Sequence, residues 1–441
     1  DLEAALPLFD IALDAFRQRG QAAEEVDTIW RIAMAMHRRG NYDQSLKSVD
    51  AAMNLLDAVP TLHERTGLRG RLLDCRGLCH YRLGRLPEAI RDLTEAAGMF
   101  ASIGDIQNAA ITHHNLGISY RAAGNVIEAV HHYRQALSNW AQLGNPGWLA
   151  NTLNSLGLVY YLQGELDEAE QILANAFETA DQSGLLRLQS VILASQADLQ
   201  RDRGAREVAM SLFGQSLKLA EQVRDEFFAV YSLCGQGETL RQLQDFSTSE
   251  NTLTQAAARA DKVGAGYLVG LCKLRQGVLA QDQGDFQEAL TCLLAAREAM
   301  DSGGYTLELA QAELHLGFSA FLTGREDDAL QHLESVDNLA SQLGYDFFIA
   351  VEGRQMASLL QLGTRRLANP RRYERALKRI NQTRTIKEIE DVTKAAGDEL
   401  LLRIYGFGRG RVVLGENELA AQREQVKELF FFLLVRHPQP V

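Results

Sequence analysis

Thiol and imidazole side chains lie close together in one stretch of the sequence and suggest a metal site. Cys75 and Cys79 are four residues apart, so a helix would place both thiols on one face, next to His80. A closed metal site needs four ligands, and the sequence offers no second cluster to supply the missing pair. We therefore interpret the two cysteines as buried packing residues.

Two pairs of adjacent histidines are the other candidates for metal binding. His113-His114 and His131-His132 both fall within one repeat. Neighbouring residues on a helix point about 100° apart, so each pair can give one ligand to a shared site. We interpret these histidines as packed or solvated side chains and predict no metal site.

Sequence motifs of common enzymes are missing from the chain. It contains no GxxxxGK[ST] phosphate loop, no GxSxG elbow and no HExxH metal pair. We therefore predict a chain that is not an enzyme, without catalytic residues or a cofactor.

The larger pattern that positions these side chains is a repeat of forty residues. The stretch 115–136 reads NLGISYRAAGNVIEAVHHYRQA, and its Leu, Gly, Tyr and Ala positions return at 155–176. Each period holds two turns, at which Gly is often followed by Asn or Asp, as in Gly40-Asn41, Gly124-Asn125 and Gly284-Asp285. The period predicts a solenoid of stacked helical hairpins.

The predicted turns form two series that run at forty residues after a first spacing of forty-four. Turns inside repeats are expected at Gly40, Gly84, Gly124, Gly164, Gly204, Gln244, Gly284, Gly324 and Gly363. Turns between repeats are expected at Gly104, Gly144, Gly184, Arg224, Gly264, Gly304 and Gly344. Residues 1–19 look like the second helix of a repeat, so we expect the chain to be a piece of a longer product.

Small residues recur inside the predicted helices. The first helices carry Gly77, Gly117, Gly157, Ala197, Gly237, Gly277 and Gly317, and the second helices carry Ala89, Ala129, Ala169, Ala209, Ala289 and Ala329. A glycine inside a helix costs about 1 kcal/mol relative to alanine, so the aligned positions need a packing reason. We predict close helix–helix contact at these positions.

Charge divides the chain into an acidic and a basic part. Residues 1–364 hold 29 Lys and Arg against 47 Asp and Glu, whereas residues 365–441 hold 16 against 10. The acidic part should repel nucleic acid, and the basic part could approach it.

Cysteine usage and hydrophobicity indicate where the protein works. Five cysteines are an odd number scattered over predicted helices, which is typical of reduced thiols in the cytoplasm. The longest apolar runs, such as 429–435, are far too short to span a bilayer, so we predict no membrane partner.

The repeat resembles the tetratricopeptide repeat in Leu116-Gly117, Tyr120, Gly124-Asn125, Ala129, Tyr133 and Ala136. The period of forty is longer than that family's thirty-four, and it is similar to the sensor domains of bacterial signal-transduction ATPases such as the maltose-regulon activator. The resemblance implies an all-α, tetratricopeptide-like right-handed superhelix of about eight to nine hairpins over residues 1–363.

After Gly363 the period ends and two further segments are expected. Residues 364–398 would form a basic helical linker, in which Asn369-Pro370 opens a helix. Residues 399–441 would begin with strands at 400–405 and 411–414, a turn at 415–417 and a helix at 422–436. This short α/β piece resembles the start of the winged-helix DNA-binding domain of antibiotic-regulatory transcription factors. The chain ends before any recognition helix, so DNA would be bound only by a completed domain.

The resembled family binds its ligands on a concave wall lined by the first helices. Carrying that register over gives Arg71, Asp74, His114, Arg121, Asn151, Asn154, Tyr161, Asp198, Arg201, Tyr231, Glu238, Arg241 and Gln311. Amide, guanidinium and aromatic groups on a rigid wall suit hydrogen bonding to a peptide backbone or to a sugar-like small-molecule effector. The alternative is an ordinary polar helix face.

The basic segment 365–387 is a second candidate binding surface. It holds nine Lys and Arg against a single acidic residue, and its helical part carries Arg371, Arg372, Arg375, Lys378 and Arg379. These residues could follow DNA phosphates, dock on the acidic solenoid or another domain, or simply be solvated.

We interpret the chain as the effector- or partner-binding regulatory region of a cytoplasmic bacterial transcription regulator. The alternative is a protein-interaction scaffold that binds a peptide in its groove and has no link to transcription. The predicted strands, turn and helix at 400–436 favour the first hypothesis, because a scaffold has no need of them. A second copy of the chain is left open as a partner.

Overall fold

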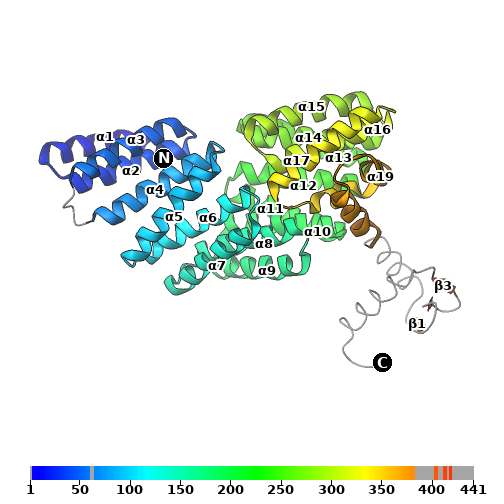
Figure 1. Ribbon diagram of the computed structural model, residues 1–441, viewed down its shortest axis with the longest axis horizontal. Coiled ribbons are helices and arrows are strands. Elements are labelled where there is room, and N and C mark those ends of the chain that lie inside the picture. The colour runs from blue at the N-terminus through cyan, green and yellow to red at the C-terminus, as the bar shows by residue number, and fades with distance from the viewer. Residues whose placement is uncertain (1, 60–63, 383–401, 406–410, 415–416, 420–441) are drawn as a thin grey trace. The chain divides into compact units, whose positions relative to one another are not determined.

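A computed structural model of the chain describes residues 2–59, 64–382, 402–405, 411–414 and 417–419. The chain divides into two compact units, Asp1–Ala376 and Leu377–Val441. The first unit is an all-α solenoid of the tetratricopeptide type, in which antiparallel helices follow one another along the chain (Figure 1). The predicted fold class is confirmed.

Nineteen α-helices and one 3-10 helix, η1, follow one another in the described part of the solenoid between Leu2 and Arg366. They are α1 Leu2–Arg19, α2 Ala22–Arg38, α3 Tyr42–Ala58, α4 Arg65–Arg82, α5 Leu86–Ser102, α6 Ile106–Ala122, α7 Val126–Leu143, α8 Pro146–Gln163, α9 Leu166–Gln182, α10 Leu186–Arg203, α11 Arg206–Gln222, α12 Glu226–Gln242, α13 Phe246–Val263, α14 Gly266–Gln283, α15 Phe286–Gly303, α16 Thr306–Leu322, α17 Glu326–Leu343, α18 Phe347–Glu352, η1 Gly353–Gln355 and α19 Ala357–Arg366. Residues 371–382 are also helical.

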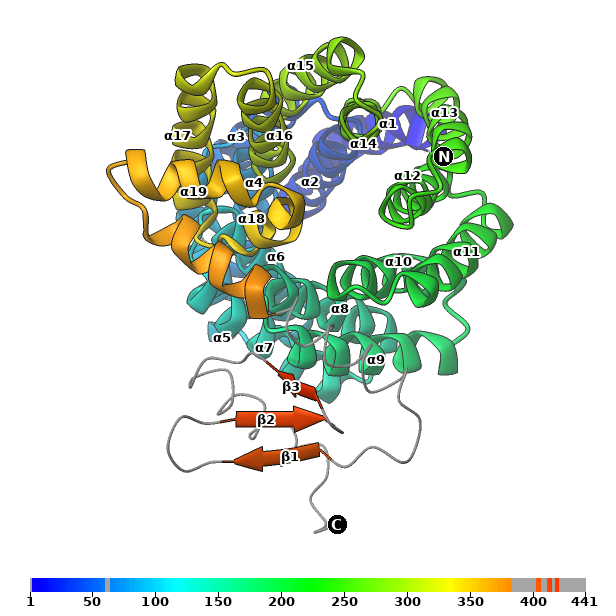
Figure 2. The same cartoon turned by 90° about the vertical axis from the view of Figure 1, so that its right-hand side faces the viewer.

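The helices form hairpins of a first, even-numbered helix and a second, odd-numbered helix. We number the hairpins from α2–α3, so that α16–α17 is the eighth. Seen along the long axis of the solenoid, the first helices lie on the inner side and the second helices on the outer side (Figure 2). Each first helix therefore contacts both its own second helix and the next first helix.

Left-handed backbone geometry at the predicted turns confirms the period. The glycines of both series up to Gly344 have positive φ angles, and so do Arg224 and Gln244, with φ of 57° and 65°. These two are the described residues other than glycine with positive φ, and both stand where the period requires a turn. The tertiary repeat therefore imposes a backbone conformation that their side chains disfavour.

The expected helix caps are present in part. The side chains of Asn125 and Asp285 accept hydrogen bonds from the backbone N–H groups of Glu128 and Glu288, at 3.3 and 3.1 Å. Asn41 precedes α3 in the same way, but its side chain makes no capping hydrogen bond. The predicted turn at Gly40 is therefore confirmed, whereas the predicted capping bond of Asn41 was wrong.

Close packing explains the small residues of the first helices. A Cβ atom at Gly117 would lie 2.6 Å from the ring of Tyr133, and one at Gly157 would lie 2.8 Å from Leu173. The partner is sixteen residues further along the chain, on the second helix of the same hairpin, and the same spacing recurs at Gly77, Gly237 and Gly277. The alanines of the second helices, Ala89, Ala129, Ala169, Ala209, Ala289 and Ala329, are fully buried.

The ninth hairpin departs from the period. Its first helix is broken into α18, η1 and α19, and Gly363 lies inside α19, where an added Cβ atom would lie 3.3 Å from the ring of Tyr373. The predicted turn at Gly363 was therefore wrong. The break falls at Gly353, ten residues earlier, where the chain instead contacts the inner wall of the solenoid.

The second unit contains a three-stranded antiparallel sheet in the described residues. Its strands are β1 Leu402–Tyr405, β2 Arg411–Leu414 and β3 Asn417–Leu419, in the order β1-β2-β3. Leu402 pairs with Leu414, and Val412 pairs with Leu419. The first two strands were predicted, whereas Asn417 was expected in a turn and begins β3. The helix expected at 422–436 lies outside the described residues.

Candidate functional site

Hydrogen bonds between successive first helices build the inner wall of the solenoid. The carboxylate of Asp74 on α4 accepts hydrogen bonds from Thr112 at 2.9 Å and from Asn115 at 3.2 Å, both on α6. Burial raises the pKa of Asp74 to about 6, although both hydrogen bonds act to lower it. This end of the wall is therefore held by one carboxyl group and neutral donors.

The next links along the wall are also short polar contacts. His114 Nδ1 on α6 lies 3.0 Å from the hydroxyl of Thr152 on α8. Burial lowers the pKa of His114 to about 4, so its ring is neutral at pH 7. The phenol of Tyr161 on α8 donates to the carboxylate of Asp202 on α10.

From α10 onward the wall carries buried ion pairs. Arg201 donates to Asp198 at 2.7 Å and to Asp202 at 2.8 Å, and its side chain is 8% exposed. The phenol of Tyr231 on α12 donates to Asp198 at 2.6 Å. Three charged groups on α10 are thus fixed in one geometry, because each makes a hydrogen bond to another member of the cluster.

A second ion-pair cluster lies one repeat further on. Glu238 accepts two hydrogen bonds from Arg241, at 2.7 and 3.0 Å, and its carboxylate also lies 3.9 Å from the guanidinium of Arg275 on α14. Burial alone would raise the pKa of Glu238, but the two arginines lower it to about 2. Arg241 also pairs with Asp282 on α14.

Residues 344–356, which we call the groove segment, contact this wall. The segment contains α18 and η1, and its Glu352 carboxylate accepts a hydrogen bond from Gln311 at 2.9 Å. The same carboxylate lies 3.3 Å from Arg275 and 3.3 Å from His315. Burial opposes the charge on Glu352, yet Arg275 and His315 hold its pKa well below its usual range. Glu352 therefore supplies a counter-charge to α14 and α16.

Other residues of the groove segment contact helices much earlier in the chain. The ring of Phe347 meets the ring of Tyr161 edge to face, with centroids 6.5 Å apart. Arg354 donates to the backbone carbonyl of Asp202. Gly344 approaches the turn at Gly124 so closely that a Cβ atom would overlap the carbonyl there. Thus the segment spans from the α6–α7 turn to α16.

A small cavity remains between the groove segment and the wall. Its volume is about 70 Å³, and it is lined by Arg206, Arg241 and His315 on one side and by Glu352 and Arg354 on the other. Most of the lining residues are polar or charged, so the space suits water or a polar group.

The residues predicted to line the concave wall differ in the contacts that they make. Those already described form the bonds between first helices, and Arg121 meets the phenols of Tyr133 and Tyr345. Arg71 pairs with Asp27 at 2.7 Å, and Asn151 is half-buried. Asn154 is buried, and its side-chain oxygen accepts no hydrogen bond from the described residues. Their role in binding a ligand stays a prediction.

Sequence reasoning missed several residues of this site. Arg275 and His315 are forty residues apart, so they occupy the same position of the repeat as Gly235. That position lies one helical turn after Tyr231, which was predicted to line the wall. The period alone would therefore have placed them on the inner wall. Glu352 carried no such signal, because it lies where the repeat is broken.

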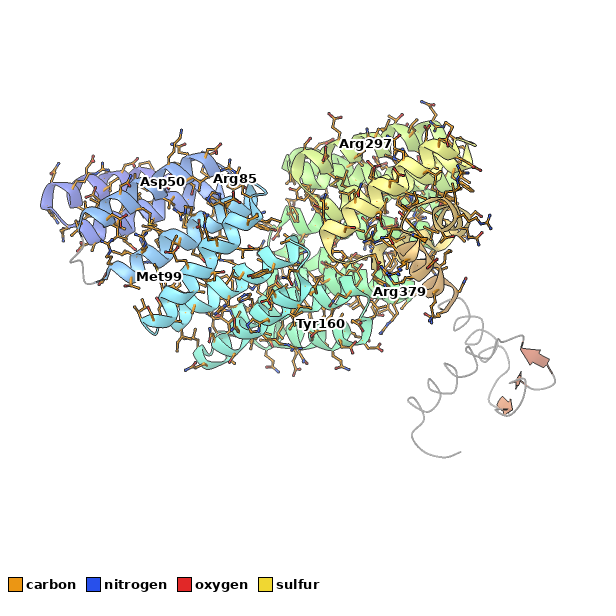
Figure 3. The ribbon with its side chains drawn as sticks, viewed as in Figure 1. Asp50, Arg85, Met99, Tyr160, Arg297 and Arg379 are labelled. Atoms are coloured by element: carbon orange, nitrogen blue, oxygen red, sulfur yellow. The ribbon has the colours of Figure 1, made fainter. Side chains whose placement is uncertain are left out.

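Two of the predicted basic residues contact the solenoid itself. Arg372 donates to the backbone carbonyl of Asp337 at 2.9 Å and to Ser341 at 3.2 Å, and Arg375 pairs with Asp346. Arg371 and Lys378 are exposed, and Arg379, labelled in Figure 3, is half-buried. Contact with nucleic acid stays a prediction for all five.

The thiol and imidazole clusters are packed. Cys75 and Cys79 are buried, and Cys79 lies 3.2 Å from the hydroxyl of Ser45. The rings of His113 and His132 meet through their Nδ1 atoms at 3.1 Å. Among the described residues, no three His, Cys, Asp or Glu side chains are grouped in a way that could hold a metal ion. No described helix has the length and apolar character needed to cross a bilayer.

One family model of the tetratricopeptide repeat matches residues 68–142 and 148–222, and a second model of the same repeat matches residues 274–341. No curated protein matches the chain in sequence.

Three solved structures illustrate the similarity of the fold. A Rap protein complexed with competence and sporulation factor is 13% identical, with a TM-score of 0.56, over 78% of this chain and 97% of that one. The apo quorum sensor NprR from B. thuringiensis is 14% identical, with a TM-score of 0.53, over 77% and 98%. Aspartyl phosphate phosphatase F from Bacillus subtilis is 12% identical, with a TM-score of 0.57, over 76% and 94%. At this level of identity the likeness shows the fold alone.

Proposed function

We propose that the inner wall of the solenoid binds a peptide or an extended protein segment and that this binding regulates an output function. The observation that carries the proposal is the groove segment: the wall already holds a stretch of polypeptide, through side chains of α8, α14 and α16. A wall that accommodates one backbone and its side chains has the spacing and the polar groups to accommodate another.

The chemistry of the wall favours a peptide over a sugar-like small molecule. The described cavity beside Glu352 is only about 70 Å³, whereas the polar side chains extend from α4 to α16. A long, narrow row of donors and acceptors suits an extended ligand. Similar folds occur in a Rap protein complexed with competence and sporulation factor and in a quorum sensor, which is consistent with an effector-binding role.

The output that we propose is transcription. The three-stranded sheet at 402–419 supports the start of a winged-helix domain, and the basic residues around Arg371 supply positive charge before it. Peptide binding would change the small rotations between neighbouring hairpins, and these rotations add along a solenoid. A scaffold that only holds a peptide is the second candidate.

We assign the described region no catalytic role. The buried carboxylates of Glu238 and Asp198 form ion pairs with arginines, and Asp74 is held by hydrogen bonds from Thr112 and Asn115, so each has a structural partner on the wall. We place the protein in the cytoplasm, because all five cysteines are buried free thiols, as expected in a reducing compartment.

A display library of random twelve-residue peptides, selected on the immobilised chain, tests the proposal. Asn151→Ala on the inner wall should weaken the selected peptides by roughly tenfold through a lost hydrogen bond. Asn175→Ala is the matched control, since Asn175 is exposed on the second helix α9. Failure to select any peptide, or equal binding by both variants, would contradict a groove-binding function.

A further inference from the structure

The contacts of Glu352 have the form of a ligand site. Its carboxylate meets an amide donor of Gln311, a guanidinium of Arg275 and a ring nitrogen of His315, from two neighbouring first helices. The side chains of Arg275 and Glu352 are 9% and 7% exposed, so this is a nearly dry anion site. An amide, a guanidinium and an imidazole converging on two oxygens are well suited to a carboxylate.

The occupant of this site belongs to a segment that is set apart from the repeat. Every complete first helix from α4 to α16 is a continuous helix of 17 or 18 residues, whereas α18 has 6 residues and is followed by η1 with 3. The break leaves Glu352 and Arg354 directed at the wall, with Arg354 reaching the carbonyl of Asp202. The groove segment thus meets the wall in short, irregular backbone, as a separate peptide would.

Arg275 depends on Glu352 for its counter-charge. The nearest carboxylate oxygen of Glu238 is 3.9 Å from Arg275, and the two oxygens of that carboxylate each already accept a hydrogen bond from Arg241, whereas Glu352 lies at 3.3 Å. If Glu352 leaves, a buried guanidinium keeps only its more distant partner, which is costly unless another anion enters. The site therefore selects for a negatively charged replacement.

We propose that Arg275, Gln311 and His315 form an anion site for an acidic side chain of the effector peptide, and that Glu352 is its internal competitor. The inference rests on the proposed peptide-binding function and gives that function a defined contact. The incoming Asp or Glu takes the place of the Glu352 carboxylate, and the groove segment from α18 to η1 leaves the wall.

Competition with an internal segment makes a quantitative prediction about affinity. A segment tethered to the chain acts at a high effective concentration, so a peptide in solution binds weakly while Glu352 holds the site. Glu352→Gln keeps the size of the side chain and removes its charge. This variant should weaken the internal competitor and leave Arg275, Gln311 and His315 in place for the external one.

The experiment uses a fluorescently labelled peptide with the sequence of residues 345–356, YDFFIAVEGRQM, and a second peptide with Gln in place of its Glu. Fluorescence polarisation measures binding to the full chain, to the Glu352→Gln chain and to Glu334→Gln, a control on the exposed surface of α17. We expect the Glu352→Gln chain to bind the acidic peptide roughly tenfold or more tightly than the other two chains do. The same chain should prefer the acidic peptide over the Gln peptide by a similar factor.

Two further variants keep the test decisive. Adding Arg275→Gln to Glu352→Gln should remove the preference for the acidic peptide. If Glu352→Gln does not give a native thermal melt, Arg354→Gln weakens the internal segment at its other contact and should also tighten binding of the acidic peptide.

Equal binding by all chains, equal binding of the acidic and Gln peptides, or no binding of either peptide to the Glu352→Gln chain would overturn the proposed anion site. Peptides selected from the random library would still bind the wall in those cases if the proposed function is right. Failure of that selection, in contrast, would remove the function itself.

Discussion

The eighth and ninth hairpins start from the same period and fold differently. In the eighth, α16 and α17 are regular helices, and α16 bonds to α14 across 34 and 38 residues of sequence, from Gln281 to His315 and Ser319. In the ninth, Glu352 contacts Arg275 across 77 residues, and Arg354 contacts Asp202 across 152. A regular first helix extends the wall, whereas the broken one covers it.

A repeat protein can therefore contain a site that its repeat pattern does not predict, because one of the contacts comes from an irregular segment. The inner wall from α10 to α14 gathers Arg201, Arg241 and Arg275, and their charges need partners in a dry environment. Carboxylates of the wall satisfy the first two. Arg275 obtains its closest partner from the irregular segment.

The largest effect is expected from a substitution that disrupts the packing of a regular hairpin. Ala129 is fully buried at the start of α7, so Ala129→Arg forces a charged side chain into a packed contact. We expect a loss of about 4 kcal/mol or more in the free energy of unfolding, through overpacking and an unpaired charge. A thermal or denaturant melt measures it, and an unchanged midpoint would show that the assigned packing register is wrong.

The next largest effect is expected from a substitution that removes an ion pair between the ninth hairpin and the inner wall. Arg275→Met leaves the Glu352 carboxylate buried without its guanidinium partner, and breaking such a pair costs about 3–5 kcal/mol. Arg297→Met is the control, because Arg297 lies on the second helix α15 (Figure 3) and its loss should change stability by less than about 0.5 kcal/mol. Similar urea midpoints for both variants would contradict the pairing.

A smaller effect is expected when helical glycines are replaced by alanine, and it depends on how closely each glycine is packed. Gly117→Ala places a Cβ atom 2.6 Å from the Tyr133 ring and should cost about 1–3 kcal/mol. Gly98→Ala, in the middle of α5, meets no atom within 4 Å and should gain about 0.5–1 kcal/mol. The two changes should move the melting temperature in opposite directions, and a shift of the same sign would refute the packing explanation.

The smallest effect separates the two ends of the wall by pH. Asp74 has a pKa raised by burial to about 6, so its contribution to stability is full below about 4 and is lost as the pH rises through 6. Glu238 has a pKa lowered to about 2, so its contribution is present above about 4.5 and is lost as the pH falls toward 2.

Matched variants measure these opposite slopes. Asp74→Asn should gain roughly 1–2 kcal/mol relative to the parent chain when the pH is raised from 4.5 to 7.5. Glu238→Gln should lose most relative to the parent at neutral pH and progressively less below pH 4.5. Chemical denaturation at several pH values checks both, and parallel curves for parent and variants would be inconsistent with the two assigned environments.

Much of the solenoid could be predicted because each repeat contacts mainly its neighbours. The forty-residue period located even the left-handed turns at Arg224 and Gln244, which no local propensity indicates. The same logic failed at Gly363, since the ninth hairpin is shaped by contacts with α8 and α10, far away in the sequence. Periodicity carries no information about such contacts.

For the candidate site, the helix face that carries it could be predicted, but the contacts between its residues could not. The register placed Arg201, Tyr231, Glu238 and Arg241 on first helices, but it gave no indication of the ion pairs and hydrogen bonds that hold them, such as those from Arg201 and Tyr231 to Asp198. Nor did it indicate that Glu352 would arrive from a broken helix. Ion pairing between helices depends on side-chain reach and burial, which are set by the folded structure.

Hydrogen exchange of residues 347–355 tests the central claim most directly. Mass spectrometry would compare the free chain with the chain saturated by a peptide selected from the random library. We expect slow exchange in the free chain, because the segment is packed on the wall, and faster exchange of these residues when the peptide displaces it. Unchanged or slower exchange in a saturated complex would show that the peptide and the groove segment do not compete for the wall.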